Sequence, residues 1–301
     1  MRRILKISLL LVLLALLLAL GGGYLGALHP AGDSLAVFRA YFVAPVLLLA
    51  ALALVTGMRL VAGVSGLCGI LALISVWGLV PLGKADAAQG SGFELYQKNM
   101  LFRNPDPSQI SADILARRPD FVTLQEVSPA NRVIFDHLRA VYPAQHYCPF
   151  AGVGGVGISS VWPKVEGSGL CAVAGRGMAA MQVVTPNGPV WVVSMHLFWP
   201  WPHSQDAQLK TLWPVLGAFE GKVVIGGDFN MVPWSHQLRQ VERTSRAELL
   251  GPATISLVKA GGFLRVPIDH VLVTGGQGQV RRLPLLGSDH FGLLAGFELS
   301  P

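Results

Sequence analysis

Acidic, amide and imidazole side chains recur in this sequence at the ends of short apolar segments. A carboxylate that follows a fully apolar strand is costly to bury unless a cation or hydrogen bonds compensate its charge. Several such positions meeting at one edge of a core would form a site rich in oxygen ligands and imidazoles, which suits Mg²⁺ or Mn²⁺ acting on a phosphate. The positions are Asn99, Glu126, His196, Asp228, Asn230, Asp269, Asp289 and His290.

The elements that must position these residues are mostly short strands. Helical spacing is found over residues 108–117 and 131–140. Strands outnumber helices, and their uneven spacing excludes a repeat architecture. An α/β (α+β) sandwich of two sheets flanked by helices therefore fits better than a doubly wound parallel sheet. The predicted strands are 93–97, 121–124, 157–162, 179–184, 190–195, 223–225, 268–273 and 292–297.

The residues around these polar positions form six short motifs. They are Asn99 at the end of the first strand, Leu124-Gln125-Glu126, Met195-His196-Leu197, Gly227-Asp228-Phe229-Asn230, Ile268-Asp269-His270 and Ser288-Asp289-His290. In this order they resemble the endonuclease/exonuclease/phosphatase superfamily, the DNase I-like phosphoesterases. The neighbouring segments 99–104 and Pro233-Trp234-Ser235, with three apolar runs near the N-terminus, resemble its membrane-anchored bacterial branch. The resemblance extends from about residue 93 to 299. It implies a two-sheet DNase I-like domain that hydrolyses phosphoric ester bonds.

The resemblance also implies a metal site. Glu126 would be the main ligand of Mg²⁺ or Mn²⁺, and Asn99 and Asp289 would lie close to the ion or its waters. Hard divalent cations of this kind prefer carboxylate and carbonyl oxygens, so the three residue types suit the role.

The remaining motif residues receive catalytic roles from the same resemblance. Asp228 and Asn230 would orient the attacking water and the phosphate, with Asp228 as the general base. His290 would contact the scissile phosphate, and Asp269 behind it would fix the tautomer of the ring. His196 would be a second imidazole that stabilises the transition state or protonates the leaving oxygen.

The first third of the chain has a different character. Hydrophobic residues make up 52% of the sequence and charged residues only 13%, and the mean hydropathy of +0.51 excludes a wholly soluble protein. Three apolar runs predict transmembrane helices at about 4–22, 35–56 and 60–82. The first run also has the shape of a cleaved signal peptide, which would leave two spans. We predict a membrane anchor over 1–84, a linker over 85–92 and a catalytic domain over 93–301.

The distribution of charged residues indicates membrane topology rather than a nucleic-acid ligand. The net charge is +6, but residues 1–84 carry six Lys or Arg and one Asp, a net +5, which leaves +1 for the rest. Bulk charge is therefore no argument for nucleic-acid binding. The basic N-terminus predicts an N-terminus inside a bacterial cytoplasmic membrane and a catalytic domain on its outer face. Cys148 and Cys171 would pair in that oxidising compartment or remain separate core residues.

Together these features predict a membrane-tethered, divalent-metal-dependent phosphoesterase, most directly a phosphodiesterase or nuclease. The substrate would be a phosphate ester, either a nucleic acid or a phospholipid head group. The alternative enzyme is a phospholipid or small phosphomonoester phosphatase, and the alternative of another class is an inactive membrane-anchored binding module. The sequence indicates no protein partner.

Overall fold

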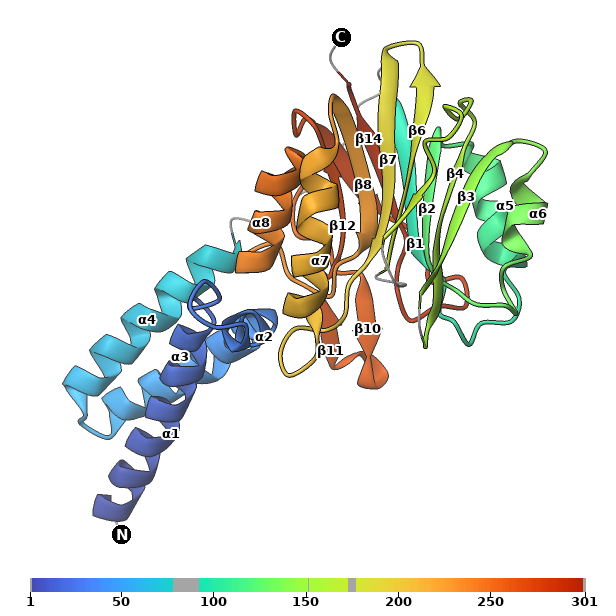
Figure 1. The fold of residues 1–301 in the computed structure, drawn as a ribbon. Helices are drawn as coiled ribbons and strands as arrows, with labels where there is room; N and C mark the ends of the chain where they lie inside the picture. The colour runs from blue at the N-terminus through green and yellow to red at the C-terminus, as the bar shows by residue number, and fades with distance from the viewer. Residues whose placement is uncertain (1, 78–91, 151, 173–176, 300–301) are drawn as a thin grey trace.

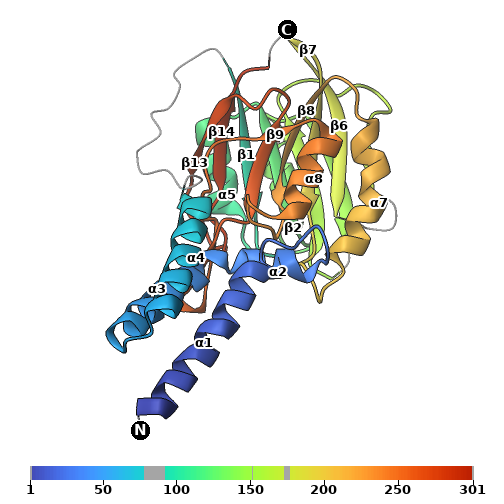
Figure 2. The ribbon, with the colours of Figure 1, turned by 90° about the vertical axis from the view of Figure 1, so that its left-hand side faces the viewer.

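The computed structural model describes residues 2–77, 92–150, 152–172 and 177–299, and these form an N-terminal group of helices and a two-sheet domain (Figure 1). Most of the predicted 85–92 linker and residues 78–82 of the third predicted span lie outside the described residues. The second view shows the helices leaving the domain on one side (Figure 2).

The N-terminal helices are α1 (Arg2–Gly22), α2 (Ala31–Val37), α3 (Arg39–Val55) and α4 (Arg59–Trp77). By length and composition, α1 and the Arg59–Val76 part of α4 could each cross a membrane. The second predicted span corresponds to the pair α2 and α3, which are bent by 69° relative to each other. The predicted 35–56 helix is therefore interrupted, and the interruption lies at Phe38, which has a non-helical backbone.

The bend has a cause in contacts with the two-sheet domain. Both carboxylate oxygens of Asp33 in α2 accept backbone hydrogen bonds at the start of α8, from His236 N (2.6 Å) and Gln237 N (3.2 Å). The indole nitrogen of Trp234 donates to the carbonyl oxygen of Ala36 (2.8 Å). These contacts fix α2 along the domain, so α3 must change direction to leave it.

Each of the two sheets has six strands. Alternate residues of both sheets face one shared apolar core, which includes Leu95, Phe121, Val192, Val224 and Val271. The first sheet has the order β13-β14-β1-β2-β4-β3, with β1 (Phe93–Asn99), β2 (Phe121–Val127), β3 (Ala144–Phe150), β4 (Gly154–Ser160), β13 (Gly278–Arg282) and β14 (Leu293–Phe297). The second has the order β5-β6-β7-β8-β12-β9, with β5 (Leu170–Cys171), β6 (Met178–Thr185), β7 (Gly188–His196), β8 (Lys222–Asp228), β9 (Glu248–Leu249) and β12 (Asp269–Val273).

Helices cover the outer faces of both sheets (Figure 1). α5 (Ser108–Arg117) and α6 (Ile134–Leu138) pack on the first sheet, and α7 (Gln205–Ala218) and α8 (His236–Ser245) pack on the second. A hairpin of β10 (Leu257–Lys259) and β11 (Leu264–Val266) extends beyond the sheets, with a short 3₁₀ turn at Ala260–Gly262. This architecture confirms the predicted two-sheet α/β sandwich.

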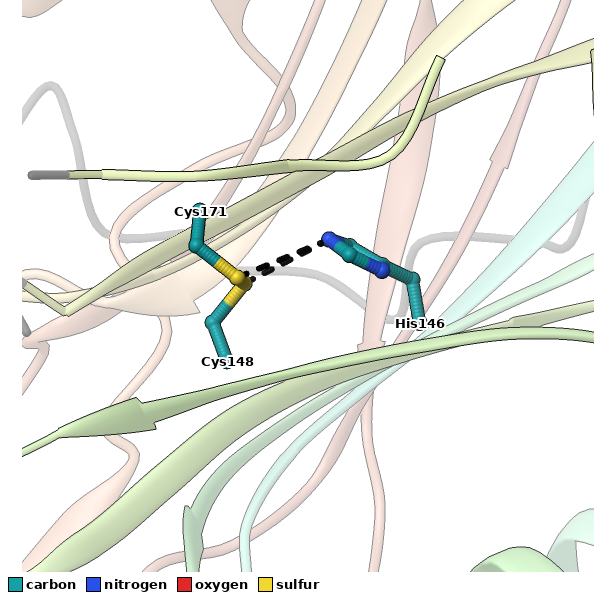
Figure 3. Close-up of side chains that lie close together, drawn as sticks. All are labelled: His146, Cys148 and Cys171. Atoms are coloured by element: carbon teal, nitrogen blue, oxygen red, sulfur yellow. Dashed lines mark hydrogen bonds between the residues drawn. A yellow bond between two sulfur atoms is a disulfide. The ribbon is translucent and has the colours of Figure 1, made fainter. Parts of the chain in front are cut away.

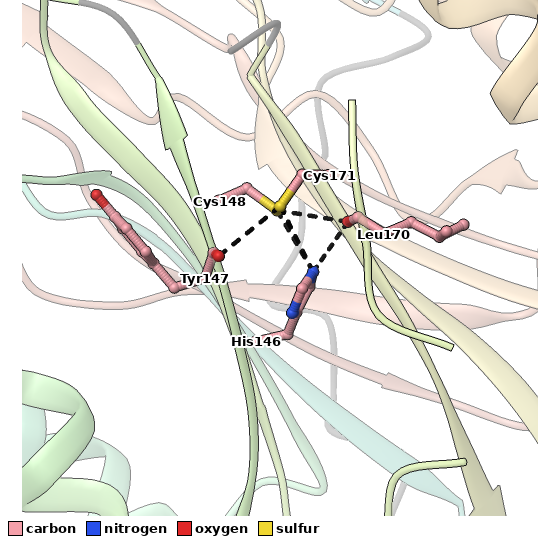
Figure 4. Close-up of a disulfide and its surroundings, with 5 residues drawn as sticks. All are labelled: His146, Tyr147, Cys148, Leu170 and Cys171. Carbon is pink, nitrogen blue, oxygen red and sulfur yellow. Dashed lines mark hydrogen bonds between the residues drawn. A yellow bond between two sulfur atoms is a disulfide. The ribbon is translucent and has the colours of Figure 1, made fainter. Parts of the chain in front are cut away.

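A disulfide joins the edges of the two sheets. Cys148 in β3 is bonded to Cys171 in β5, 23 residues away, which settles the pairing that the sequence left open (Figure 4). The ring of His146 lies beside the bond, with its Nε2 atom 3.4 Å from the sulfur of Cys148 and 3.7 Å from that of Cys171 (Figure 3). The third cysteine, Cys68 in α4, carries a free thiol.

Candidate active site

Strand pairing brings the polar strand ends together. β1 and β2 are parallel, with Asn99 opposite Gln125, and β7 and β8 are parallel, with His196 opposite Asp228. β12 runs antiparallel to β8, which places the start of β12 at the end of β8. Because the carboxyl ends of parallel strands lie at one sheet edge, the side chains that follow them reach the same cleft.

Glu126 and Asn99 are connected directly. A register shift in β2 lies at this point, and Glu126 adopts a positive φ of 56°. The side-chain nitrogen of Asn99 donates to Glu126 Oε1 (3.1 Å) and to Asp228 Oδ2 (3.0 Å). Glu126 Oε2 accepts a hydrogen bond from Phe102 N (2.8 Å). The Asn99 amide thus joins carboxylates from the two sheets.

Two imidazoles face the same oxygen of Asp228. The distance to Asp228 Oδ2 is 3.6 Å from His196 Nε2 and 3.8 Å from His290 Nε2. Asn230 N donates to Asp228 Oδ1 (3.0 Å), and the Asn230 side chain donates to Leu197 O (2.7 Å). The Asp228 carboxylate is therefore held in position with one oxygen directed at both rings.

Asp269 lies directly behind His290. Nδ1 of His290 donates to Asp269 Oδ2 (2.7 Å), and Gln97 Nε2 donates to Asp269 Oδ1 (2.9 Å). All three side chains are buried. This hydrogen bond leaves Nε2 of His290 as the atom that faces the cleft.

Burial and charge separate the protonation states of these groups. Burial alone would lower the pKa of His290, but the carboxylates of Asp269 and Asp228 outweigh it and raise this pKa to about 9. Burial and the nearby His290 lower the pKa of His196 to about 3. Burial and the Asp269 carboxylate raise the pKa of Asp228. The site therefore holds one cationic and one neutral imidazole beside a carboxylate with increased basicity.

Asp289 takes a more peripheral place. Its Oδ2 atom lies 3.4 Å from Lys259 Nζ, and its Oδ1 atom lies 4.0 Å from His290 Nε2. Among the described residues, the His and carboxylate clusters at this site contain Glu126, His196 and Asp228, or Asp228, Asp269 and His290, but not Asp289. The structure thus brings seven of the eight predicted positions into direct contact, with Asp289 at the rim.

Lys98 is a site residue that the sequence analysis missed. It is buried in β1, and its ammonium donates to the carbonyl oxygens of Pro284 (3.2 Å), Leu285 (2.6 Å) and His290 (2.6 Å). Burial lowers its pKa to about 8. The one available signal was a lysine inside a predicted strand, directly before Asn99. Lys98 attaches the loop that carries His290 to the first sheet.

Aromatic side chains form the walls of the cleft. It has a volume of about 290 Å³, with Glu126, His196, Asp228 and His290 among its lining residues. The ring of Phe150 packs against His196 (5.2 Å between centroids) and Phe198 (5.1 Å). Trp199 and Lys259 contribute to the lining as well. The cleft combines a polar floor with largely apolar walls, as small-ligand sites do.

The floor of the cleft fits a hard divalent cation by its donor set. The carboxylates of Glu126 and Asp228 are the ligand type that Mg²⁺ and Mn²⁺ prefer, and Asn99 lies beside them with its side-chain nitrogen toward both and its oxygen accepting from Leu101 N. Within the described ranges, no Lys or Arg forms an ion pair with Glu126 or Asp228. His290 is the cation that faces Asp228, whereas Glu126 has no ion-pair partner among the described residues, so a further cation would balance the second carboxylate.

Comparison with family models identifies the domain. Residues 96–290 match the model described as "Endonuclease/Exonuclease/phosphatase family". The chain belongs to this family. Members of the endonuclease/exonuclease/phosphatase family hydrolyse phosphoric esters, so the chain is a hydrolase of this class. No curated protein sequence matches the chain.

Several solved structures share the fold of the endonuclease/exonuclease/phosphatase domain. A family protein from Leptotrichia buccalis has a TM-score of 0.54 and 12% identity, covering 68% of this chain and 99% of that one. A truncated TDP2 from Caenorhabditis elegans has a TM-score of 0.53 and 14% identity, covering 69% and 98%. A mutant beta toxin from Staphylococcus aureus with bound magnesium ions has a TM-score of 0.52 and 12% identity, covering 69% and 100%.

Proposed function

We propose that the chain is a membrane-tethered, divalent-metal-dependent phosphodiesterase. One observation carries this proposal: the Asp228 carboxylate directs one oxygen at both His196 and His290, beside the Glu126–Asn99 pair. Hydrolysis of a phosphate ester needs a water that loses a proton, groups that neutralise charge on the phosphoryl oxygens, and help for the leaving oxygen. The cleft offers a residue for each requirement.

Glu126 would hold the metal, with Asn99 beside it and Asp289 at the rim in contact with its waters. A bound Mg²⁺ or Mn²⁺ supplies polarisation of a phosphoryl oxygen. The beta toxin structure of similar fold contains magnesium ions, which supports this choice of cation. The Phe102 amide donates to Glu126 Oε2, and the side-chain nitrogen of Asn99 donates to both Glu126 Oε1 and Asp228 Oδ2, which keeps the two carboxylates side by side.

The proton transfers follow from the protonation states. Asp228 accepts a proton from the attacking water, because its raised pKa makes it a stronger base than an ordinary carboxylate. Cationic His290, fixed by Asp269, donates a hydrogen bond to the phosphate and balances its growing charge. Neutral His196 donates a hydrogen bond toward the leaving oxygen, and Asn230 holds Asp228 in place.

Turnover of bis-p-nitrophenyl phosphate tests the reaction. The full chain in detergent should release p-nitrophenol with Mg²⁺ or Mn²⁺, and Glu126→Ala or Asp228→Ala should abolish release. Asp136→Ala is the matched control, because Asp136 lies on the surface and pairs only with Arg139 among the described residues. Metal-independent turnover, or equal turnover by Asp228→Ala and wild type, would refute the proposal. Metal binding without any turnover would favour the inactive binding module.

We propose nucleic acid as the first substrate to test, because the motif set resembles DNase I-like enzymes. Incubation of DNA and RNA with the protein and Mg²⁺ should release products that Asp228→Ala does not release. The second candidate is a phospholipid head group. It is favoured by the contacts between α2 and the catalytic domain, which keep the domain at the end of apolar helices. Head-group release from labelled liposomes, with no cleavage of DNA or RNA, would select this candidate.

We propose that the N-terminus lies inside and the catalytic domain on the outer face of a bacterial cytoplasmic membrane. The basic Arg2, Arg3 and Lys6 support this orientation, and the Cys148–Cys171 disulfide is of the kind that persists in oxidising compartments. In intact spheroplasts, added protease should cleave the catalytic domain. Protection of the domain until the membrane is permeabilised would refute the orientation.

A further inference from the structure

Besides α8 and Trp234 just before it, the catalytic domain touches the N-terminal helices through two further segments. The 198–203 loop is one: the Ser34 hydroxyl donates to the carbonyl oxygen of Trp201, and the rings of His29 and Trp201 meet edge to face at 6.2 Å. The β10–β11 hairpin is the other. It lies beside the N-terminal helix group in the ribbon, next to α2 (Figure 1).

The hairpin is held by Tyr41, in the first turns of α3. The Tyr41 hydroxyl accepts from Arg265 N (2.6 Å), and its proton lies within reach of Phe263 O (3.2 Å) and Arg265 O (3.0 Å). These are backbone contacts, so they fix the hairpin itself rather than one mobile side chain. Both segments are therefore placed at the end of the apolar helices.

Both segments also expose large apolar side chains there. Phe263 is 86% exposed at the tip of the hairpin, and Trp201 is 52% exposed in the loop. Leu28, in the turn between α1 and α2, is 80% exposed at the same junction. Apolar groups gathered at one place on a surface mark an interaction site. Aromatic residues at the ends of spanning helices are typical of the boundary between lipid head groups and acyl chains.

We propose that Phe263, Trp201 and Leu28 form a membrane-contact surface that enters the outer leaflet of the bilayer. The inference rests on the proposed membrane anchoring of α1, α3 and α4. A lipid bilayer is the fitting partner because the surface is continuous with the helices that would cross it. Arg265 is exposed on the same hairpin, and its side-chain Nε donates to the carbonyl oxygen of Gly262 (2.9 Å), which supports the tip that carries Phe263.

The surface adjoins the mouth of the catalytic cleft. Trp199 belongs to the same loop as Trp201, and Lys259 belongs to the same hairpin as Phe263; both line the cleft. If the loop and the hairpin rest on lipid, the mouth of the cleft lies at the level of the lipid head groups. A phosphate ester carried at the membrane surface would reach the site directly.

Lipid quenching of a fluorescent label tests the contact. Phe263→Cys is made in a Cys68→Ala background, labelled with an environment-sensitive fluorophore under non-reducing conditions, and placed as the full chain in phosphatidylcholine vesicles. The matched control is Val184→Cys, because Val184 is also exposed but lies in β6, away from the N-terminal helices (Figure 1). Lipids spin-labelled near the head group should quench the label at 263 several-fold more than the label at 184, and its emission should be blue-shifted.

Equal quenching at both positions would overturn the proposal. A second outcome would also overturn it: a blue-shifted emission of the 263 label that grows as more protein is added per vesicle, with no quenching by lipid. That result would indicate that a second copy of the chain, not lipid, covers Phe263. Hydrolysis of soluble bis-p-nitrophenyl phosphate by the labelled protein is measured in the same vesicles. Lipid quenching without hydrolysis would refute the proposed activity alone, and hydrolysis without lipid quenching would refute the membrane contact alone.

Discussion

Replacing Lys98 with methionine separates the positioning of the active site from the stability of the fold. The Lys98 ammonium holds three carbonyl oxygens of the loop that leads to His290. Methionine has a similar length and fills the same buried space, but it cannot donate a hydrogen bond. The substitution therefore releases the loop with little change in the packing around β1.

Two opposing terms set the effect on stability. All three carbonyl oxygens lose the ammonium, but that of Leu285 keeps a hydrogen bond from Ser288 N. The carbonyl oxygens of Pro284 and His290 are then the two that lose the hydrogen bond from Lys98 without this replacement. An unpaired buried polar group costs about 1–3 kcal/mol, which gives about 2–6 kcal/mol for the pair. Against this, the pKa of Lys98 falls from 10.5 to about 8, so removal of the buried charge regains roughly 3 kcal/mol. The net loss of stability should be small, at most about 3 kcal/mol.

The effect of Lys98→Met on the rate of catalysis should be larger than its small effect on stability would suggest. A displacement of a catalytic group by about 1 Å can cost about 100-fold in rate, and the released backbone includes the carbonyl of His290 itself. Lys98→Met should lower kcat for bis-p-nitrophenyl phosphate by about 10- to 100-fold with little change in KM, because His290 acts mainly on the transition state. Lys222→Met is the control, since Lys222 donates to Asn187 O at the surface.

Kinetics and thermal unfolding of the two variants in detergent test whether Lys98 positions His290 or only stabilises the fold. A kcat that stays within two-fold of wild type would refute the positioning role. Activity that falls only in proportion to the unfolded fraction of Lys98→Met would refute it as well, because the residue would then serve stability alone.

Four further predictions concern the metal, acid stability, the anchor and the disulfide. Chelation with EDTA should abolish phosphodiester turnover, and Mg²⁺ or Mn²⁺ should restore it; retained turnover after chelation would exclude the metal site. Burial lowers the pKa of His270 to about 4, so this ring is neutral in the fold but titrates at 6.5 when unfolded. Its contribution, up to about 3 kcal/mol, is complete above pH 6.5 and is lost as the pH falls toward 4; unfolding of His270→Gln should be less pH-dependent over that range. Asp33→Ala removes an acceptor of the His236 amide and should cost about 1–2 kcal/mol, seen as faster hydrogen exchange at the start of α8 but not in α5. The Cys148–Cys171 bond spans 23 residues, so the double Ser variant should lose about 3 kcal/mol of stability; an unchanged melting temperature would contradict this.

The strand-end residues could be predicted from the sequence because their positions follow from local patterns. Each of Glu126, His196 and Asp228 stands at the end of an apolar strand. Parallel pairing of β1 with β2 and of β7 with β8 brings such ends to one edge within each sheet, and the face-to-face packing of the two sheets brings the two edges together. The two-sheet architecture likewise follows from many short strands with few helices. Local patterns were therefore enough to predict the class of fold and to name residues that the structure places together in one cleft.

Other features depend on partners distant in the sequence. Lys98 contacts carbonyls 186 to 192 residues away, and backbone acceptors leave no mark in a sequence pattern. Asp33 caps α8 from 203 residues away, so hydropathy alone places residues 35–56 in one apolar run and does not show the bend at Phe38. Asp289 lies in a motif with His290 but turns to Lys259, which local spacing does not indicate.

The lining of the cleft is held by contacts outside the catalytic residues. Phe150 lies two residues after Cys148, so the disulfide between the sheets also restrains the ring that packs on His196. Trp199 and Lys259, which also line the cleft, belong to segments that hydrogen-bond to the N-terminal helices. The helices are thus more than a tether, because they share a buried apolar cluster with the domain that includes Val37 and Trp234. The shape of the cleft therefore depends both on a covalent link and on the attachment of the N-terminal helices.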